Sequence, residues 1–210
     1  VLAEVTGRAP SEVADLITEA ATAGVVHVAG PEPADARFAH DLFRETLAAG
    51  LPAARRLDLH HRVARALARR HERGGAVFPA ELARHFAAAI GVAGTGPALA
   101  WAYAAAEADR SRFAFTEAAG HLARVRAAAA GAGQQLTGAD LIGLGTAEAD
   151  LRLRAGEAAA ARALLDDAWR RALATGDADL LAAVALGLDR VGARFAMPRD
   201  DLTAALATAR

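Results

Sequence analysis

For metal and nucleophilic chemistry the chain offers seven histidines, two serines and no cysteine. The histidines are His27, His40, His60, His61, His71, His85 and His121. None has the His-Glu-x-x-His spacing that places two zinc ligands on one helical face, and Glu81 with His85 fits a surface pair equally well. Neither serine lies in a Gly-x-Ser-x-Gly turn. The sequence therefore predicts no metal site and disfavours an enzyme.

The basic residues exclude one class of nucleotide site. All 24 of them are arginine. The phosphate-binding loop Gly-x-x-x-x-Gly-Lys-[Ser/Thr] requires a lysine to reach the phosphates of the nucleotide. We therefore expect the chain not to hydrolyse ATP by itself.

Arginine is concentrated between Ala53 and Arg73. Seven arginines there face only Asp58 and Glu72, so the segment carries a net charge of +5 in a chain whose total is −1. A basic helix can contact phosphates or an acidic partner, although such a row is more often a solvated helix face. Six later arginines have the same two interpretations. They are Arg124, Arg126, Arg152, Arg154, Arg170 and Arg171.

The aromatic residues of the second half are candidates for a ligand surface or for core packing. They are Trp101, Tyr103, Phe113, Phe115 and Trp169. Aromatic residues make up only 5% of the chain, and alanine-rich helices need bulky side chains where they cross. We expect these five residues to belong to the core and assign them no site role.

The elements that position these residues begin with an amphipathic helix behind the candidate cap Ser11. Its apolar positions recur at helical spacing and are Val13, Leu16, Ile17 and Ala20. Its other face carries Glu12, Asp15 and Glu19, and we expect Gly24 to end it. No arginine lies between Ser11 and Ala23, so this helix would be repelled by DNA.

A β-hairpin is expected next. Val25–Val28 favours a strand, the residues from Gly30 to Pro33 favour a turn, and Arg37-Phe38 can return as a second strand. A helix from about His40 to Ala49 follows, and Pro52 opens a longer helix. Residues 1–75 therefore predict a small winged-helix-like unit with a short hairpin.

Residues 76–210 predict only helices. Helix-opening positions recur near Pro97, Ala139 and Asp177. Two apolar stripes follow the helical period: one is Leu165, Ala168, Trp169, Ala172 and Leu173, and the other is Leu181, Val184, Leu188 and Val191. Neither stripe can be buried alone, so we expect successive antiparallel hairpins to stack into a tetratricopeptide-like solenoid.

Two segments of the chain carry a family resemblance. The run from Arg37 to Leu47, with Leu51–Arg56 and Leu59–Ala64 after it, resembles the winged-helix region of bacterial signal-transducing ATPases with numerous domains. Large ATP-binding regulators of the LuxR type are the closest kind. The continuation from Pro79 to Phe86 is similar to the family's first repeat helices. In that family a nucleotide-binding domain precedes this region, a helical repeat array follows, and a DNA-binding domain lies at one end.

The resemblance implies a role for His40. Phe38-Ala39-His40-Asp41 resembles a Met-His-Asp-like motif whose histidine contacts the β-phosphate of bound ADP and holds the inactive form, although this chain departs from the motif's usual first residue. An imidazole at a helix N-terminus can make a charge-assisted bond to a diphosphate. The alternative is that His40 only caps or packs its helix.

Three functions remain open. The first is a sensor and coupling segment of a multidomain transcriptional regulator, in which an effector or a protein binds the repeats and the winged-helix-like unit relays this to the nucleotide-binding domain. ATP or ADP would then be the cofactor of the full-length protein. The second is a protein-interaction scaffold without nucleotide coupling. The third and weakest is a DNA-binding winged helix.

The chain starts at Val1 with no signal-peptide pattern, so we expect a fragment of a longer cytoplasmic protein. The window from Phe86 to Ala106 carries no charge and is long enough to span a bilayer. Glycines and Pro97 interrupt it, so it predicts two helices around a loop and no membrane segment.

Overall fold

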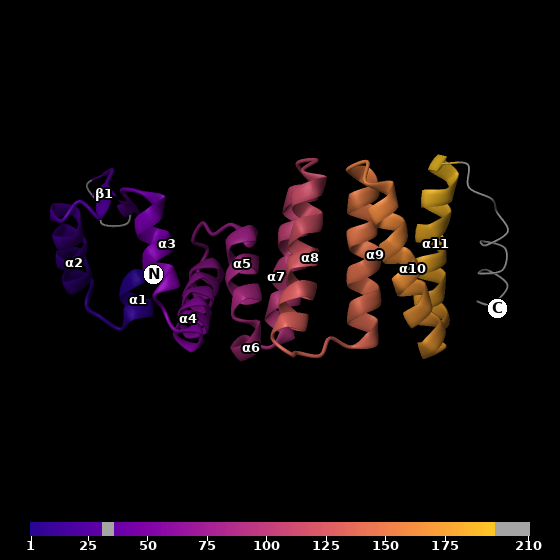
Figure 1. The fold of residues 1–210 in the computed structure, drawn as a ribbon, viewed down its shortest axis with the longest axis horizontal. Coiled ribbons are helices and arrows are strands. Elements are labelled where there is room, and N and C mark those ends of the chain that lie inside the picture. The colour runs from indigo at the N-terminus through magenta and orange to yellow at the C-terminus, as the bar shows by residue number, and fades with distance from the viewer. Residues whose placement is uncertain (31–35, 196–210) are drawn as a thin grey trace. The chain divides into compact units, whose positions relative to one another are not determined.

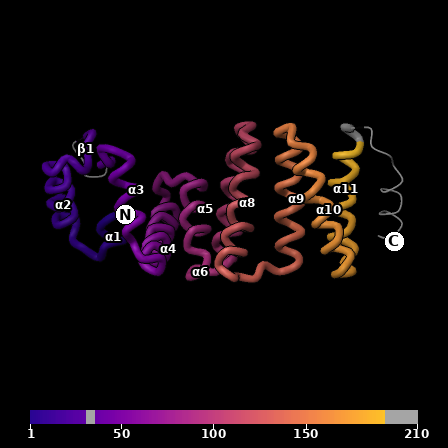
Figure 2. Tube along the Cα trace, viewed as in Figure 1, coloured from indigo at the N-terminus to yellow at the C-terminus, as the bar shows by residue number. Residues whose placement is uncertain are grey.

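The computed structural model describes residues 1–30 and 36–195, without the side chains of residues 193–195. The described chain is mainly helical and contains one two-stranded sheet (Figures 1 and 2). It divides into two compact units, Val1–Val77 and Phe78–Arg210.

The first unit contains four helices and a hairpin in its described part. They are α1 (Leu2–Thr6), α2 (Pro10–Thr22), β1 (Val26–Val28), β2 (Ala36–Phe38), α3 (Asp41–Ala49) and α4 (Ala53–Glu72). The expected cap Ser11 is wrong, because α2 already begins at Pro10. The Glu12 side chain instead accepts a hydrogen bond from the Ala9 N–H at 3.0 Å. Proline at the first helical position lacks only an N–H that has no partner within the helix.

The hairpin lies between α2 and α3. Its strands are antiparallel, with Val26 opposite Phe38 and Val28 opposite Ala36. The Ala39 N–H adds a hydrogen bond to the Val25 carbonyl at 2.9 Å. The predicted pair of strands is confirmed, whereas the predicted turn residues Pro31 and Pro33 lie outside the described residues.

Helix α4 packs against α1 and holds it with arginines. Arg69 Nε donates to Glu4 at 2.6 Å, and Arg62 donates to the Val5 carbonyl at 3.3 Å. Val5 is buried. A five-residue helix is unstable alone, so these contacts and the burial of Val5 keep α1 in place.

The second unit is built from helices throughout its described part. They are α5 (Pro79–Ala88), α6 (Ile90–Ala93), α7 (Thr95–Arg110), α8 (Phe115–Gly131), α9 (Gly138–Arg154), α10 (Ala158–Thr175) and α11 (Ala178–Phe195). From α7 onward each helix packs against the next along the chain, and α9 also contacts α11 (Figure 1). The uncharged window therefore holds the end of α5, the single turn α6 and most of α7.

The core of the last three helices follows the predicted stripes. Leu181, Val184, Leu188 and Val191 are all buried and pack with Leu165, Ala168 and Ala172 in one cluster. Trp169 is only partly buried against this cluster, and Leu173 is 44% exposed, so its predicted burial is wrong. Leu173 follows the fully buried Ala172 by about 100° around α10, so it lies at the edge of the stripe and not at its centre.

Close helix approach explains why small residues fill this core. A Cβ at Gly145 of α9 would lie 3.6 Å from the Leu164 carbonyl of α10, and one at Gly187 of α11 would lie 2.7 Å from Leu165 Cδ2. A Cβ at Gly187 would therefore force the Leu165 side chain to move, whereas one at Gly145 would make an ordinary contact. No described helix is both long and apolar enough to cross a membrane.

Candidate functional site

The candidate nucleotide contact His40 lies between β2 and α3. Its side chain is exposed and makes no capping hydrogen bond, and its ring centre is 6.0 Å from that of Phe43. Its main-chain carbonyl accepts from the Phe43 N–H at 3.1 Å. His40 therefore presents an exposed ring at a helix N-terminus, as the resemblance requires, and its contact with a phosphate stays a prediction.

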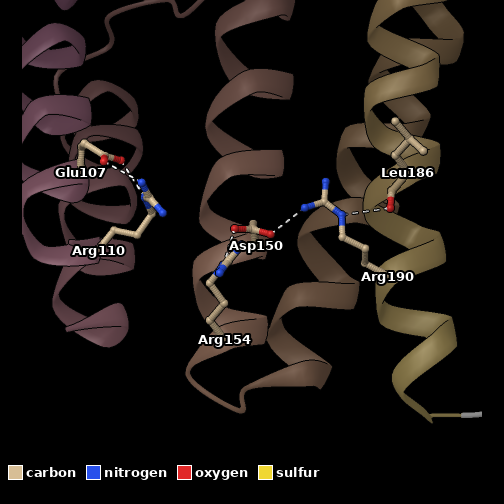
Figure 3. A network of polar contacts seen from close by, with 6 residues as sticks. All are labelled: Glu107, Arg110, Asp150, Arg154, Leu186 and Arg190. Atoms are coloured by element: carbon tan, nitrogen blue, oxygen red, sulfur yellow. Dashed lines mark hydrogen bonds and ion pairs between the residues drawn. The ribbon is translucent and has the colours of Figure 1, made fainter. Parts of the chain in front are cut away.

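Figure 3 draws two groups of polar contacts of the second unit: one lies within α7, and the other joins α9 to α11. We call the six residues together the network face and define it by Glu107, Arg110, Asp150, Arg154, Leu186 and Arg190. The first two residues belong to α7, the next two to α9 and the last two to α11. Three helices that are not consecutive in sequence thus contribute to one surface.

Glu107 and Arg110 form the α7 part of this face. Arg110 Nε and Nη2 each donate to a Glu107 oxygen at 2.7 Å, which is a bidentate pair. This hydrogen bonding lowers the pKa of Glu107 and raises the pKa of Arg110. Both side chains are exposed, so the pair fixes the direction of the guanidinium and adds little to stability.

Asp150 on α9 joins two arginines. Its Oδ2 accepts from Arg154 Nε at 2.8 Å, and its Oδ1 accepts from Arg190 Nη1 at 2.8 Å. Arg190 Nε also donates to the Leu186 carbonyl at 3.3 Å, which holds the arginine along α11 (Figure 3). The charge of Asp150 also acts to raise the pKa of Arg110 on α7. One carboxylate therefore ties α9 to α11 through Arg190.

Tyr103 extends the same side of α7 toward the start of α9. A Cβ at Gly143 would lie 3.4 Å from the Tyr103 hydroxyl, so the phenol reaches the backbone of α9. Burial, together with the negative charge of Asp140, raises the pKa of Tyr103. The hydroxyl therefore stays neutral, and able to donate a hydrogen bond, up to a higher pH than the hydroxyl of an ordinary tyrosine.

A buried carboxylate links α8 to α9. Arg126 Nη2 on α8 lies 2.9 Å from Glu148 Oε2, close enough for an ion pair but not aligned as a hydrogen bond. Arg152 Nε donates to Glu148 Oε1 at 2.8 Å, and Arg152 Nη1 donates to Glu157 at 2.5 Å. The hydrogen bond to Glu148 is the main cause of the raised pKa of Arg152. Two arginines therefore compensate the charge of Glu148.

A second buried pair joins α7 to α8. His121 Nε2 lies 2.9 Å from Asp109 Oδ2, and Arg124 Nη1 lies 3.1 Å from His121 Nδ1. A guanidinium only donates, so Nδ1 accepts and Nε2 carries the proton toward Asp109. Arg112 also donates to Asp109. Both ring nitrogens are engaged, which suits a structural role and leaves no ring nitrogen to act as a base.

The prediction that five aromatic residues belong to the core is wrong for Phe113, which is 80% exposed, and for Tyr103, which is 40% exposed. Trp101, Phe115 and Trp169 are half-buried, and Trp169 packs against the core cluster of the last three helices. Arg154 of the network face lies over the Phe115 ring at 5.9 Å, so this aromatic helps to position a site residue.

The basic segment of α4 is partly paired within its own unit. Asp58 accepts from Arg55 and from Arg62, both at 3.2 Å. Arg69 pairs with Glu4. These contacts favour the interpretation of a solvated face with local ion pairs. In the part of the chain that the structure describes, no cluster of histidine and acidic residues is arranged to hold a metal ion.

The sequence analysis did not identify five residues of the network face. They are Glu107, Arg110, Asp150, Leu186 and Arg190. The sequence does contain a signal for this face, because arginine recurs in the C-terminal part of three alternate helices: Arg110 in α7, Arg154 in α9 and Arg190 in α11.

A scan of protein-family models, a search of curated proteins and a search of solved structures gave no match to this chain.

Proposed function

We propose that this chain is the sensor and coupling segment of a multidomain, cytoplasmic, NTPase-type transcriptional regulator. The helical unit binds an effector or a protein, and the first unit relays that event to a nucleotide-binding domain of the same protein. The observation that carries the proposal is the network face, where three alternate helices present charged groups that core packing does not require.

A stack of tetratricopeptide-like hairpins accounts for this face. If α7–α8 and α9–α10 are successive hairpins and α11 begins a third, then α7, α9 and α11 are equivalent helices on one side of the stack. Their arginines then occur once per repeat. The ion pair between Asp150 and Arg190 and the approach of Tyr103 to Gly143 support this arrangement.

The chemistry of the face favours an acidic partner segment. Its six residues carry three guanidinium groups and two carboxylates. Each guanidinium has five N–H donors, so pairing with one carboxylate leaves donors for a ligand. Leu186 is 61% exposed beside Arg190 and offers an apolar contact. A partner that places a carboxylate near an apolar side chain fits these features.

The relay operates as a population shift. An effector that binds one arrangement of the protein more tightly than the other increases the population of that arrangement. The size of the shift is set by the difference between the two affinities. In the proposed inactive arrangement, His40 contacts the β-phosphate of ADP held by the nucleotide-binding domain. The hairpin between α2 and α3 supports the proposal of a winged-helix-like unit. The exposed ring of His40 supports the proposal that it is available to contact a nucleotide.

Direct DNA recognition by α2 is not proposed. Its solvent-facing residues include Glu12, Asp15 and Glu19, all exposed. Phosphates would repel this face, and groove-reading helices present basic and amide side chains instead. DNA binding would belong to another domain of the regulator.

The test compares His40→Ala with His27→Ala in the protein that carries the nucleotide-binding domain. Both histidines are exposed in the first unit, but His27 lies on β1. We expect faster release of a fluorescent ADP analogue and higher basal activity for His40→Ala only. Equal release rates for the two variants and the unaltered protein would remove the coupling role.

The network face also favours a second candidate, a protein-interaction scaffold without nucleotide coupling. The two candidates differ in what charge reversal on this face changes. Arg154→Glu is expected to weaken partner binding in both cases. If nucleotide exchange no longer responds to the partner in this variant, coupling is supported; if exchange never responds to the partner, the scaffold is supported.

A further inference from the structure

A pocket of about 420 Å³ lies among α8, α9, α10 and the turn between α8 and α9. Leu141 and Gly145 contribute the α9 part of its lining. Gly145 and Asp150 lie about 140° apart around the helix axis, at 3.6 residues per turn. The pocket therefore opens on a different side of α9 from the network face, and no step proposed above uses it.

Part of the pocket lining is apolar. It includes Leu141 and Leu164, together with Ala129 and Leu136. Gly145 adds backbone to this part of the lining, and a Cβ there would lie 3.6 Å from the Leu164 carbonyl. A pocket of this volume with apolar lining residues suits a small organic molecule.

The rim carries the charge. Arg126 from α8 and Arg171 from α10 both line the pocket. Arg171 uses Nε to donate to Asp167 at 2.7 Å, and Arg126 directs Nη2 at Glu148. Each guanidinium keeps further N–H donors for a ligand. Gln134 and Gln135 add amide groups from the turn.

The local charge balance favours one negative charge on the ligand. Three charged side chains line the pocket, and they are Arg126, Arg171 and Asp167, so the lining carries one excess positive charge. Asp167 pairs with Arg171 at 2.7 Å and with Arg170, which does not line the pocket, at 3.1 Å.

We infer that this pocket binds a small monocarboxylic acid with an apolar body, whose carboxylate lies between Arg126 and Arg171. The inference rests on the proposed function in that this acid would be the effector of the helical unit. Binding to the chain is nevertheless measurable without a nucleotide-binding domain. The apolar body would cover Leu141 and Leu164 and remove them from water.

The test titrates the chain with 2-naphthoate by isothermal calorimetry, with the neutral 2-naphthamide as the matched ligand. We expect saturable one-to-one binding of the acid and binding of the amide that is at least about tenfold weaker, because the amide forms no charge-assisted bond. Absence of saturable binding of 2-naphthoate, or equal binding of the amide, would overturn the inference.

Two neighbouring arginines provide the control in the protein. Arg170 and Arg171 both pair with Asp167, but only Arg171 lines the pocket. Arg171→Gln is expected to weaken 2-naphthoate binding by about tenfold or more, and Arg170→Gln by about twofold or less. Equal effects would show that the charge of α10 as a whole, and not the pocket, attracts the ligand.

A second pair of variants tests the location. Ala130 and Ala127 are both exposed on α8, and only Ala130 lines the pocket. Ala130→Phe is expected to abolish binding and Ala127→Phe to preserve it, with unchanged helical circular dichroism in both. Binding that survives Ala130→Phe would overturn the assigned location. Failure of these binding tests would not affect the ADP-release test of His40. Likewise, an unchanged ADP release in His40→Ala would not contradict ligand binding in the pocket.

Discussion

Glu148 on α9 and Arg126 on α8 approach to 2.9 Å, although the glutamate is fully buried. A buried carboxylate is tolerated only when cationic or hydrogen-bonding groups compensate the loss of water. Arg126 and Arg152 supply this compensation from two different helices. The pair therefore makes the contact between α8 and α9 specific, because another register of the two helices would leave the carboxylate without Arg126.

Replacing Arg126 by methionine is expected to lower the free energy of unfolding by about 3 kcal/mol, since it leaves the buried Glu148 with less compensation. Chemical denaturation followed by circular dichroism measures this change. The double variant Arg126→Met/Glu148→Met should recover most of the loss. Arg170→Met, which removes an exposed pair, should change stability by less than about 1 kcal/mol. A double variant no more stable than Arg126→Met would contradict this account.

Tyr103 is the only tyrosine of the chain, so its ionisation is directly visible in the ultraviolet spectrum. Burial, with a contribution from Asp140, raises its pKa above the ordinary 10.0. We expect the absorbance of the phenolate to appear at higher pH in the folded chain than in denaturant, and Asp140→Asn to shift it downward. Asp179→Asn on α11 is the control, and an equal shift in both variants would refute the role of Asp140.

This raised pKa also has a consequence for stability. The neutral phenol is favoured in the folded state, so its contribution is fully present below pH 10 and is lost as the pH rises through the folded-state pKa. The free energy of unfolding should fall over that range. In the Tyr103→Phe variant, the part of this decrease in the free energy of unfolding that comes from Tyr103 should be absent. Chemical denaturation at several alkaline pH values measures it.

Phe113 occupies a left-handed backbone conformation, with φ 61°, in the turn between α7 and α8. Helices α9 and α10 end with a glycine at the corresponding turn, Gly156 and Gly176, both at positive φ. The left-handed conformation costs a residue with a Cβ about 1 kcal/mol. Phe113→Gly is therefore expected to raise the free energy of unfolding by up to about 1 kcal/mol in thermal or chemical denaturation.

The control for Phe113 is Ser111→Gly, two residues earlier in the same turn. Ser111 has a right-handed helical conformation, so glycine there gains nothing and is expected to destabilise by about 0.5–1 kcal/mol. Stabilisation by both variants would point to a general effect of glycine in the turn. Destabilisation by Phe113→Gly would show that the contact of Phe113 with Phe115 outweighs the backbone strain.

Local features of the sequence were sufficient to predict most elements. The stripe of Leu181, Val184, Leu188 and Val191 is buried as a helical period of 3.6 residues requires. Asp177 precedes α11 and accepts hydrogen bonds from the N–H groups of Asp179 and Leu180, which is ordinary capping. Two short β-prone runs form the hairpin. Each of these features depends on residues close together in the chain.

The sites depended on distances that no local pattern contains. Asp150 and Arg190 are 40 residues apart in sequence and meet only because α9 and α11 lie side by side. Arg126 and Glu148 meet across the contact between α8 and α9, and Phe113 and Tyr103 stay exposed although their types favour burial. The sequence by itself determined which segments become helices and which faces of them are apolar, because periodicity and capping are properties of neighbouring residues. Only the tertiary structure decided which charges face one another, because that follows from which helix packs beside which, and at what distance.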